Sequence, residues 1–303
     1  MSLLSTPETT VKDMAAALVA PRSRSVRERA FELTLLVMTL FALVVLVVLL
    51  VDILVDGFAR LDLAFLTSYS SRNPDETGIR TGLTGTLSLM VLTALFSFPL
   101  GIAAAIYLEV FAPDNRFTRL MQVNIANLAG VPSVVYGLLA SAVFVYILGF
   151  GRVLLSGVMA LTLLILPVII VASREAIRAV PPSIMNGALA LGATPWQATY
   201  KQVLPVAMPG VFTGTILALS RAVGETAPIL VAGAVFSRRA DNVPWRIFEP
   251  FGAVPIQIYD FVKRPQEAFQ TEAAAAAIIV LMSVLLLMNT TAITLRNRYR
   301  QKL

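Results

Sequence analysis

The stretch that decides the fold runs from residue 188 to residue 228: ALALGATPWQATYKQVLPVAMPGVFTGTILALSRAVGETAP. Its first half carries enough polar residues to lie in water. Its second half is apolar enough to cross a membrane, but Arg221 and Glu225 interrupt it. A segment that faces water is therefore expected to lead directly into a membrane helix that contains charge. This combination indicates a subunit of a transporter.

The composition of the whole chain is typical of a membrane protein. Charged residues make up only 14% of the 303 residues and apolar residues 57%, whereas a soluble domain carries about 25% charged residues. The absence of Cys excludes disulfides and thiolate metal sites, and the absence of His removes the commonest general base and transition-metal ligand. Lys and Arg outnumber Asp and Glu by 24 to 18, but they gather at the ends of apolar runs, which indicates membrane orientation rather than nucleic-acid binding.

Six apolar runs are long enough to cross a bilayer as helices, since about 20 residues suffice. They cover residues 33–51, 82–108, 120–151, 153–173, 210–237 and 273–295. The fold class predicted is an all-α integral membrane protein with six transmembrane helices. Residues 1–32 and 296–303 are predicted as polar tails, 33–79 as the first span with an outer loop, and 80–295 as the main transmembrane domain. The first run is too long for the core of a signal peptide and is expected to be retained.

The basic residues predict the orientation of the chain. Lys and Arg are more numerous in the two tails and in the loops near residues 116 and 174–209 than on the other side. The positive-inside rule therefore predicts that both termini lie in the cytoplasm, with the chain in the bacterial inner membrane. The N-terminal tail is expected to be disordered and to face lipid.

Four prolines, at positions 99, 132, 167 and 228, fall within the predicted spans. Each removes a backbone hydrogen bond, so each predicts either a packing kink or a broken helix that lines a path. Kinks are favoured for the first three, and Pro228 leaves both interpretations open because charge lies beside it.

The loop at 174–209 is predicted to fold into two short helices. Pro182 suits the first turn of a helix that ends near Gly192, and this glycine suits a C-terminal cap. Thr194, Pro195 and Gln197 then form the signature of a new helix: an N-cap, a proline in the first turn and the partner of a capping box.

The second short helix carries an aromatic edge. Trp196, Tyr200 and Val203 have helical spacing, and Pro205 and Pro209 are expected to end this helix and to restart the chain into the fifth span. Two interpretations remain open on spacing alone. The aromatic rings either pack on the ends of the spans or fill a groove on another protein.

The same loop resembles the cytoplasmic coupling loop of ABC-importer permeases, a family with the type I, MetI-like fold. Its pattern is Glu-Ala-Ala, three residues, Gly, nine residues, Ile, one residue and Leu-Pro, and Gly192, Leu204 and Pro205 match it. Asn186 and Gln202 stand where the family has Glu and Ile, which puts in doubt any salt bridge of that Glu. The resemblance implies that this loop docks on an ATPase subunit. It assigns ATPase coupling to Ala188, Gly192, Ala193, Thr194, Trp196, Tyr200, Leu204 and Pro205.

The sequence GATPWQATYKQVLPVAMPG, followed by LSRAVGETAPIL, is similar to the PstA-type permeases of phosphate-specific ABC importers, over about residues 80–295. This implies an ATP-driven importer of inorganic phosphate that also contains a PstC-type permease, two PstB-type ATP-binding subunits and a PstS-type phosphate-binding protein. No G-x-x-x-x-G-K-[ST] motif occurs, so ATP and Mg are expected on the separate ATPase and no cofactor in this chain. Membrane lipid is an expected partner and nucleic acid is not.

Arg221 and Glu225 are the candidate site of the fifth span. Arg221 is predicted near mid-depth, where insertion costs about 2.5–3.5 kcal/mol. Glu225, four residues on, can pair with it, so the two either neutralise each other or place a guanidinium on an anion path. Ser220 and Thr226 are predicted to add hydroxyl contacts to the path, and Gly224 allows a local break in the helix.

Three other functions compete with phosphate import. The same architecture fits a permease for sulfate, molybdate or phosphonate, and the charged pair cannot separate these anions. A secondary transporter or channel would need ion-coupling acids in several spans, but only one span carries charge. A membrane enzyme is not supported, because the spans contain no His, no Cys and no pair of carboxylates.

Overall fold

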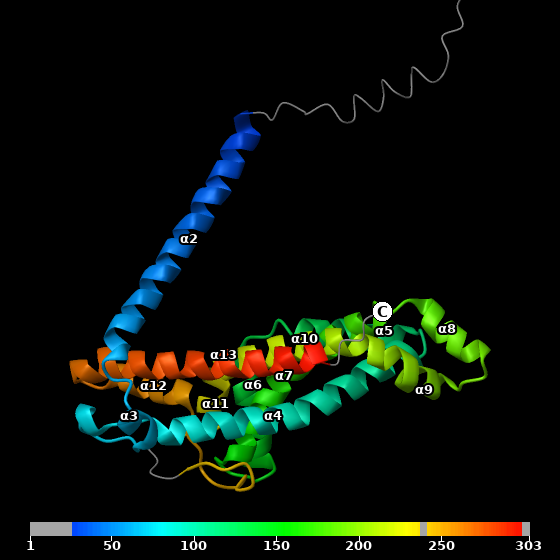
Figure 1. Ribbon diagram of the computed structural model, residues 1–303. Helices are drawn as coiled ribbons and strands as arrows, with labels where there is room; N and C mark the ends of the chain where they lie inside the picture. Colours follow the sequence, from blue (N-terminus) through cyan, green and yellow to red (C-terminus); the bar gives the residue numbers. More distant parts are fainter. Residues whose placement is uncertain (1–25, 237–240, 299–303) are drawn as a thin grey trace, which may run out of the picture. The chain divides into compact units, whose positions relative to one another are not determined.

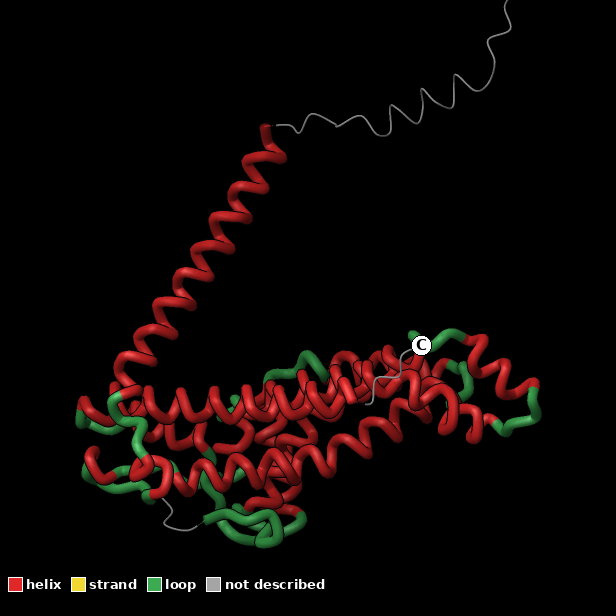
Figure 2. The backbone as a smooth tube through the Cα atoms, viewed as in Figure 1, coloured by secondary structure: helices red, strands yellow, loops and turns green. Residues whose placement is uncertain are grey.

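The computed structural model describes residues 26–236 and 241–298, and this part of the chain consists of helices and loops without a strand (Figures 1 and 2). The all-α prediction is therefore confirmed for these residues. Most of the predicted N-terminal tail, residues 299–303 of the C-terminal tail and residue 237 of the fifth apolar run lie outside the described residues.

The helices follow one another without a long structureless connection between residues 80 and 231. The first half contains α2 (Val26–Phe58), α3 (Leu63–Thr67), the 3₁₀-helix η1 (Pro74–Glu76), α4 (Arg80–Ile106), the π-helix η2 (Tyr107–Phe111), α5 (Arg116–Leu128), α6 (Ser133–Ala140) and the π-helix η3 (Ser141–Ile147). The second half contains α7 (Leu154–Arg178), α8 (Pro182–Ala190), α9 (Pro195–Ala198), the π-helix η4 (Thr199–Val203), α10 (Leu204–Val223), α11 (Ala227–Val231), α12 (Val254–Lys263), the π-helix η5 (Phe269–Ala273) and α13 (Ala274–Arg298).

The chain divides into two compact units, residues 1–52 and 53–303. In the first unit, the described residues form the greater part of α2, whose apolar side chains are exposed on all sides. An apolar surface all round a helix of this length is typical of a membrane span. All the other helices belong to the second unit.

Helix α7 is the centre of the second unit and packs against both α4 and α10. Leu161, Ile165 and Ile169 lie one turn apart on α7 and are at most 1% exposed. Gly214 lets α10 approach closely, since a Cβ atom there would lie 2.3 Å from the Cβ of Ala172. Helices α8 and α9 lie at one end of this unit and α3 and α12 at the other (Figure 1), and we refer to these as the α8–α9 end and the α3–α12 end.

Within residues 26–236 and 241–298, five helices or helical runs are long and apolar enough to cross a membrane, and a sixth span results if α5 and the α6–η3 segment count as one. The prediction of six spans is thus confirmed when the bent pair is counted as one span. Two of the predicted spans, however, are not single continuous helices. Residues 120–151 do not form one helix, because the chain bends by 105° between α5 and α6. Residues 210–237 do not form one helix either, because α10 ends at Val223 and the short α11 follows.

The prolines explain part of this difference. Pro99 and Pro167 lie inside α4 and α7, as predicted. Pro132 and Pro228 instead stand at helix starts, as the N-cap of α6 and in the first turn of α11. A proline needs no hydrogen-bonded N–H at these positions, so it begins a new helix there instead of kinking an existing one.

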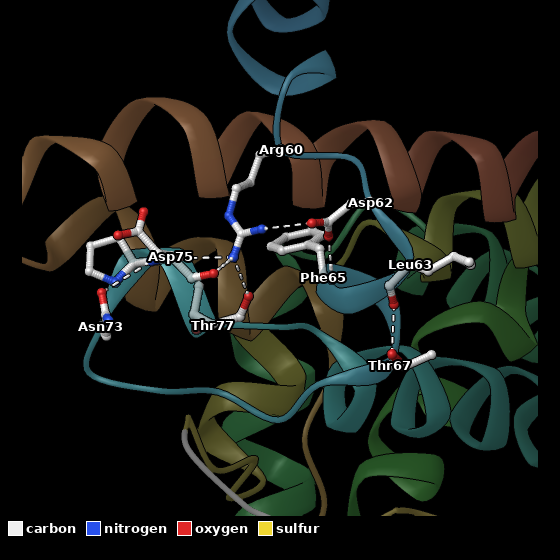
Figure 3. Close-up of polar contacts among 9 residues, drawn as sticks. Arg60, Asp62, Leu63, Phe65, Thr67, Asn73, Asp75 and Thr77 are labelled. Carbon is white, nitrogen blue, oxygen red and sulfur yellow. Dashed lines mark hydrogen bonds and ion pairs between the residues drawn. The ribbon is translucent and has the colours of Figure 1, made fainter.

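An arginine holds the segment between α2 and α4 in place at the α3–α12 end (Figure 3). The Arg60 guanidinium donates hydrogen bonds to the carbonyl oxygens of Pro74, Asp75 and Thr77 at 3.0, 2.6 and 3.1 Å. Asp62 accepts a bond from the backbone N–H of Phe65 at 2.6 Å and so caps α3. One side chain thus satisfies three carbonyls of a turn that has few other partners.

A second arginine ties the loop after residue 240 to the same end. Arg80 binds both carboxylate oxygens of Asp241, with Nε–Oδ1 at 2.7 Å and Nη2–Oδ2 at 2.5 Å. This bidentate hydrogen bond lowers the pKa of Asp241 below its usual value. The neighbouring Asn242 is buried and accepts a hydrogen bond from the N–H of Gly252 at 3.1 Å, which closes the loop upon itself.

Helix α12 carries three apolar residues at helical spacing that differ in their exposure. Ile256 is fully buried, whereas 37% of Tyr259 and 53% of Val262 are exposed. The helix therefore uses one face for the core and leaves an apolar face open.

Candidate functional site

Arg221 and Glu225 form an ion pair where a membrane helix ends. The Nε of Arg221 lies 3.2 Å from Oε1 of Glu225, and their side chains are 45% and 16% exposed. Arg221 lies in the last turn of α10, and its position near mid-depth in the membrane stays a prediction. The carbonyl end of a helix carries partial negative charge, and this stabilises a cation in the last turn. The helix itself therefore offsets part of the cost of placing Arg221 there.

The break in the chain next to this pair is confirmed. Gly224 caps α10, and its N–H donates to the carbonyl of Arg221 at 3.2 Å. The chain resumes as α11 only at Ala227. Glu225 thus lies in the interruption between two helices and its carboxylate reaches back to the arginine. Broken helices that carry charge are a common way to build a substrate site inside a membrane.

The two hydroxyls predicted beside the pair lie in different surroundings. The Ser220 hydroxyl bonds to the carbonyl of Ile216 at 2.7 Å and to Oδ1 of Asn289 on α13 at 2.6 Å. Thr226 borders a cavity of about 500 Å³ between α11 and α12, which Pro255 and Tyr259 also line. The structure therefore places Ser220 at a helix contact and Thr226 at an open surface. Their part in substrate contact stays a prediction.

The second broken span packs against the first, which the sequence did not indicate. A Cβ atom at Gly137 of α6 would lie 2.7 Å from the Cα of Pro228 on α11, so only glycine permits this approach. Tyr136, next to it, is 6% exposed and its hydroxyl donates to the carbonyl of Leu128 at the end of α5 at 2.7 Å. The bend between α5 and α6 is thereby fixed beside the interruption that holds Glu225.

The two-helix arm predicted at 174–209 is present, with α8 and α9 joined at Gly192. The φ angle of Gly192 is +86°, which is the left-handed conformation of a helix C-terminus. The N–H of Ala193 donates to the carbonyl of Ala188 at 3.1 Å, and the N–H of Gly192 donates to Leu189 at 2.9 Å. These two bonds define a Schellman motif, which explains why a glycine stands between the helices.

The second helix of the arm begins as predicted. The Thr194 hydroxyl accepts a bond from the N–H of Gln197 at 3.2 Å, and the Gln197 side chain accepts one from the N–H of Thr194 at 3.0 Å. This is the complete capping box, with Pro195 in the first turn. Leu191, at the tip, is 91% exposed and was not among the predicted coupling residues. Leu191 thus presents an exposed apolar side chain at the turn between the two helices of the arm.

The predicted end of this helix at Pro205 is wrong. Helix α9 continues through η4 into α10, so residues 195–223 form one helical run. The π-helical turn leaves room for the missing N–H of Pro205, which lies in the first turn of α10 beside the partly buried Leu204.

Trp196 and Tyr200 stack with ring centroids 6.3 Å apart and are 59% and 60% exposed. The rings contact the helix bundle and are also exposed. The structure therefore leaves open whether they pack on the ends of the spans or fill a groove on another protein.

A comparison with protein-family models matches residues 97–301 to the binding-protein-dependent transport system inner membrane component. The match covers more than half of the chain, including both broken spans and the arm. The chain belongs to this family. The predicted resemblance to ABC-importer permeases is thereby confirmed.

Several curated relatives of this inner membrane component are similar over most of their length. The probable ABC transporter permease protein YqgI of Bacillus subtilis is 32% identical over 215 residues, 71% of each chain. The phosphate transport system permease protein PstA of Mycobacterium leprae is 33% identical over 76% of this chain and 75% of its own. The probable PstA of Methanocaldococcus jannaschii is 29% identical over 80% and 84%.

Solved structures agree on the fold of the inner membrane component. A chain of a bacterial alginate ABC transporter, in complex with its periplasmic protein, matches 88% of this chain and 93% of its own with a TM-score of 0.62 at 16% identity. A chain of the MetNI methionine ABC transporter matches 74% and 98% with a TM-score of 0.59 at 18% identity. The type I, MetI-like fold that the coupling loop implied is therefore confirmed.

One further charged cluster of this inner membrane component was missed at the sequence level. Glu109 in η2 accepts bonds from Arg174 at 3.2 Å and from Arg178 at 2.8 Å, and Arg178 also pairs with Glu175 at 3.3 Å. The side chain of Arg174 is only 8% exposed. The cluster joins the end of α4 to the end of α7, directly before α8. The cluster therefore holds the chain in place where the α8–α9 arm leaves the helix bundle.

No group of three acidic side chains, the only metal-binding types in this chain, lies close enough to hold a metal ion within residues 26–236 and 241–298. The geometry instead supplies a partly exposed guanidinium at a helix break and an arm rigidly joined to the same helix.

Proposed function

We propose that this inner membrane component is a PstA-type permease of an ATP-driven importer of inorganic phosphate. The observation that carries the proposal is the partly exposed Arg221 at the break between α10 and α11, held by Glu225 at 3.2 Å. A guanidinium presents planar donors that match phosphate oxygens, and its charge persists at every physiological pH. The names of the relatives from Mycobacterium leprae and Methanocaldococcus jannaschii support phosphate over sulfate, molybdate or phosphonate.

In this proposal, phosphate exchanges contacts with the charged pair as it passes. The anion binds the guanidinium of Arg221 through charge-assisted hydrogen bonds, which are stronger where water is scarce. Glu225 orients the arginine between passages and repels a second anion, so binding stays reversible. Thr226, which opens on the cavity beside α12, offers a hydroxyl to the same path. No covalent step is needed in this chain.

The proposed assembly supplies the energy from outside this chain. A PstC-type permease completes the path, a PstS-type protein delivers phosphate, and two PstB-type subunits bind ATP and Mg. The α8–α9 arm docks on one of these ATPase subunits, with Leu191 at its tip and the aromatic edge behind it. The arm and both chain termini lie on the cytoplasmic side of the inner membrane, as the distribution of basic residues favours.

The first experiment measures uptake of labelled phosphate by cells that express the chain with its candidate partners. Excess sulfate, molybdate or phosphonate serves as competitor, and one strain lacks the ATPase subunit. The proposal requires uptake that depends on the ATPase and resists all three competitors. Uptake that persists without the ATPase would point to a secondary transporter, and loss of uptake under one competitor would point to that anion.

A variant pair tests the role of Arg221 directly. Arg221→Gln keeps the length of the side chain but removes the cation, and we expect uptake to fall by at least tenfold while the protein still assembles. Arg246→Gln is the matched control, because Arg246 also pairs with a nearby glutamate at 3.4 Å but lies on a loop and is 62% exposed in its side chain. Equal uptake by the two variants would remove Arg221 from the path.

A further inference from the structure

Helix α5 leads from the place where the arm leaves the bundle to the two broken spans. At its start, Asp114 and Arg119 line a polar cavity of about 320 Å³ together with Arg178, which ends α7 shortly before α8 begins. At its end, the carbonyl of Leu128 accepts the hydrogen bond of Tyr136, beside the contact of α6 with α11. The 13 residues of α5 extend over about 20 Å, more than half of a hydrocarbon core of about 30 Å. Helix α5 thus connects the arm with the break that holds the charged pair.

One side of α5 packs on the bundle and another is open. Thr118 is 8% exposed, and Gln122 and Ile125, which follow it at helical spacing, are partly buried. This side contacts α7. Asn124 and Asn127, three residues apart, are both exposed. We call the surface with these two asparagines the open side of α5, and it takes no part in the packing on α7.

The amides of the open side lack partners. Neither the Asn124 nor the Asn127 side chain forms a hydrogen bond to any residue within 26–236 and 241–298. By contrast, the side chain of Asn289 on α13 bonds to Ser220 at 2.6 Å. An amide that faces hydrocarbon without a partner is costly, whereas an amide that faces water is not. The open side of α5 therefore calls for a polar medium, which lipid chains do not provide.

The charges around the open side suit an anion. Arg116 is exposed and lies three turns before Asn127, about 20° from it around the helix axis. Helix α5 contains no Asp or Glu. Beyond its other end, Arg221 stands at the break between α10 and α11. A carboxamide donates hydrogen bonds without a net charge, so the two asparagines offer an anion weaker contacts than the guanidiniums on either side of them do.

We propose that the open side of α5 forms the part of the phosphate path between the charged pair and the arm, with Asn124 and Asn127 as contacts of the anion. This inference rests on the proposed function. Phosphate passes from Arg221 to the two amides and leaves past Arg116, so that weak contacts follow a strong one and the anion is not trapped. No proton is transferred, because each of these groups is a donor in its ordinary state.

The absence of Cys from the chain permits a labelling test in the complete importer. Asn127→Cys and Leu128→Cys are compared in inverted membrane vesicles, because neighbouring residues lie at nearly the same depth but about 100° apart around the helix. Leu128 is 44% exposed and is the matched control. The reagent is an anionic, membrane-impermeant methanethiosulfonate. We expect Asn127→Cys to react about tenfold faster, since a thiol in apolar surroundings ionises less, and we expect inorganic phosphate to slow this reaction.

Uptake of labelled phosphate by three further variants separates contact with the anion from packing. Asn127→Gln keeps the amide and should retain most of the uptake. Asn127→Leu should lower uptake by about fivefold, the factor of one hydrogen bond. Asn127→Asp should lower it further, because a carboxylate repels phosphate. A position that merely faces water would instead tolerate Asp better than Leu.

Several outcomes would overturn the inference while leaving phosphate import intact. These are equal labelling of the two cysteines, or greater uptake by Asn127→Asp than by Asn127→Leu, in cells whose unaltered chain imports phosphate. Labelling that is fast in the single chain and lost when the second permease is present would assign the open side to that subunit instead. If the unaltered chain imports no phosphate, but Asn127→Cys reacts fast and another oxyanion slows the reaction, the proposed substrate is refuted and the path along α5 is supported.

Discussion

The charged cluster at the root of the arm permits a sharp prediction about stability. In the native chain, one carboxylate at Glu109 serves two guanidiniums, those of Arg174 and Arg178. Glu109→Gln keeps the shape of the side chain but removes its charge. The two arginines respond differently, because Arg174 is 8% exposed and Arg178 is 54% exposed in its side chain.

The size of the effect follows from this difference in exposure. An exposed pair such as that of Arg178 contributes about 0–1 kcal/mol. Removing the partner of a buried ion instead costs about 3–5 kcal/mol, because the remaining charge is left without compensation. Arg174 therefore dominates the loss, and Glu109→Gln should destabilise the chain by about 3–5 kcal/mol. At about 2–4 °C per kcal/mol for a domain of similar size, the midpoint of thermal unfolding should fall by about 6–20 °C.

The assay is thermal unfolding of the purified full-length chain in detergent, at one scan rate, because membrane proteins often unfold irreversibly. Glu175→Gln is the matched control, since Glu175 pairs with no described residue but the exposed Arg178 and is itself 61% exposed. The double variant Glu109→Gln, Arg174→Met should recover much of the loss, because no buried charge remains. If Glu109→Gln unfolds at the same temperature as Glu175→Gln, or if the double variant is no more stable, the reasoning is refuted.

Three further predictions concern packing, pH and capping. Gly137→Ala should destabilise the protein by about 1–3 kcal/mol in thermal unfolding, because its Cβ would meet the backbone of Pro228 at 2.7 Å. The hydrogen bond from Arg80 lowers the pKa of Asp241. The stability that this pair contributes is therefore present above the pKa of Asp241 in the unfolded chain, and it is lost as the pH falls through the pKa in the folded chain. Proteolysis of the 241–253 loop should accelerate in that acidic range. Thr194→Ala should lower stability by about 1 kcal/mol through loss of the capping box and should reduce ATPase-dependent uptake more than it reduces assembly.

Each of these has a control within the chain. Gly187→Ala meets no atom within 4 Å and should leave stability unchanged or slightly raised, in contrast to the change at Gly137. Asp241→Asn should make proteolysis of the loop fast at every pH, so a pH dependence that survives in this variant would exclude Asp241 as its source. Thr194→Ser keeps the hydroxyl and should behave like the wild type, and a deficit as large as that of Thr194→Ala would mean that capping is not the cause.

Local chemistry made the arm predictable from the sequence. A glycine at Gly192 and the Thr194–Gln197 pair each specify one backbone geometry, and the structure contains both the Schellman motif and the capping box. The end of α9 was not predictable from the same reasoning. Pro205 normally interrupts a helix, but a π-helical turn at 199–203 accommodates it, and such a turn has no simple sequence signature.

The apolar runs were predictable, but their internal breaks and partners were only partly so. Run length identified the spans, and Gly224 indicated the end of α10 beside Arg221. The sequence contained no sign that Gly137 touches Pro228, because this contact joins residues far apart in the chain. The same holds for Glu109 and Arg174, which lie in different helices and become a pair only through the packing of α4 on α7. Pairing across helices depends on rotation and depth, which hydropathy does not specify.

The arm and the charged pair are the two ends of one structural element. From Pro195 to Val223 the chain is helical throughout, about 43 Å at about 1.5 Å per residue. A continuous helix transmits displacement along its axis better than segments joined by a flexible loop would. We expect a movement imposed on α9 at one end to reach Arg221 at the other. Because α10 stops at Gly224, Glu225 does not belong to the moving helix, and a shift of α10 changes the 3.2 Å distance between the two charges. We infer that the break in the span converts movement of the arm into opening and closing of the ion pair.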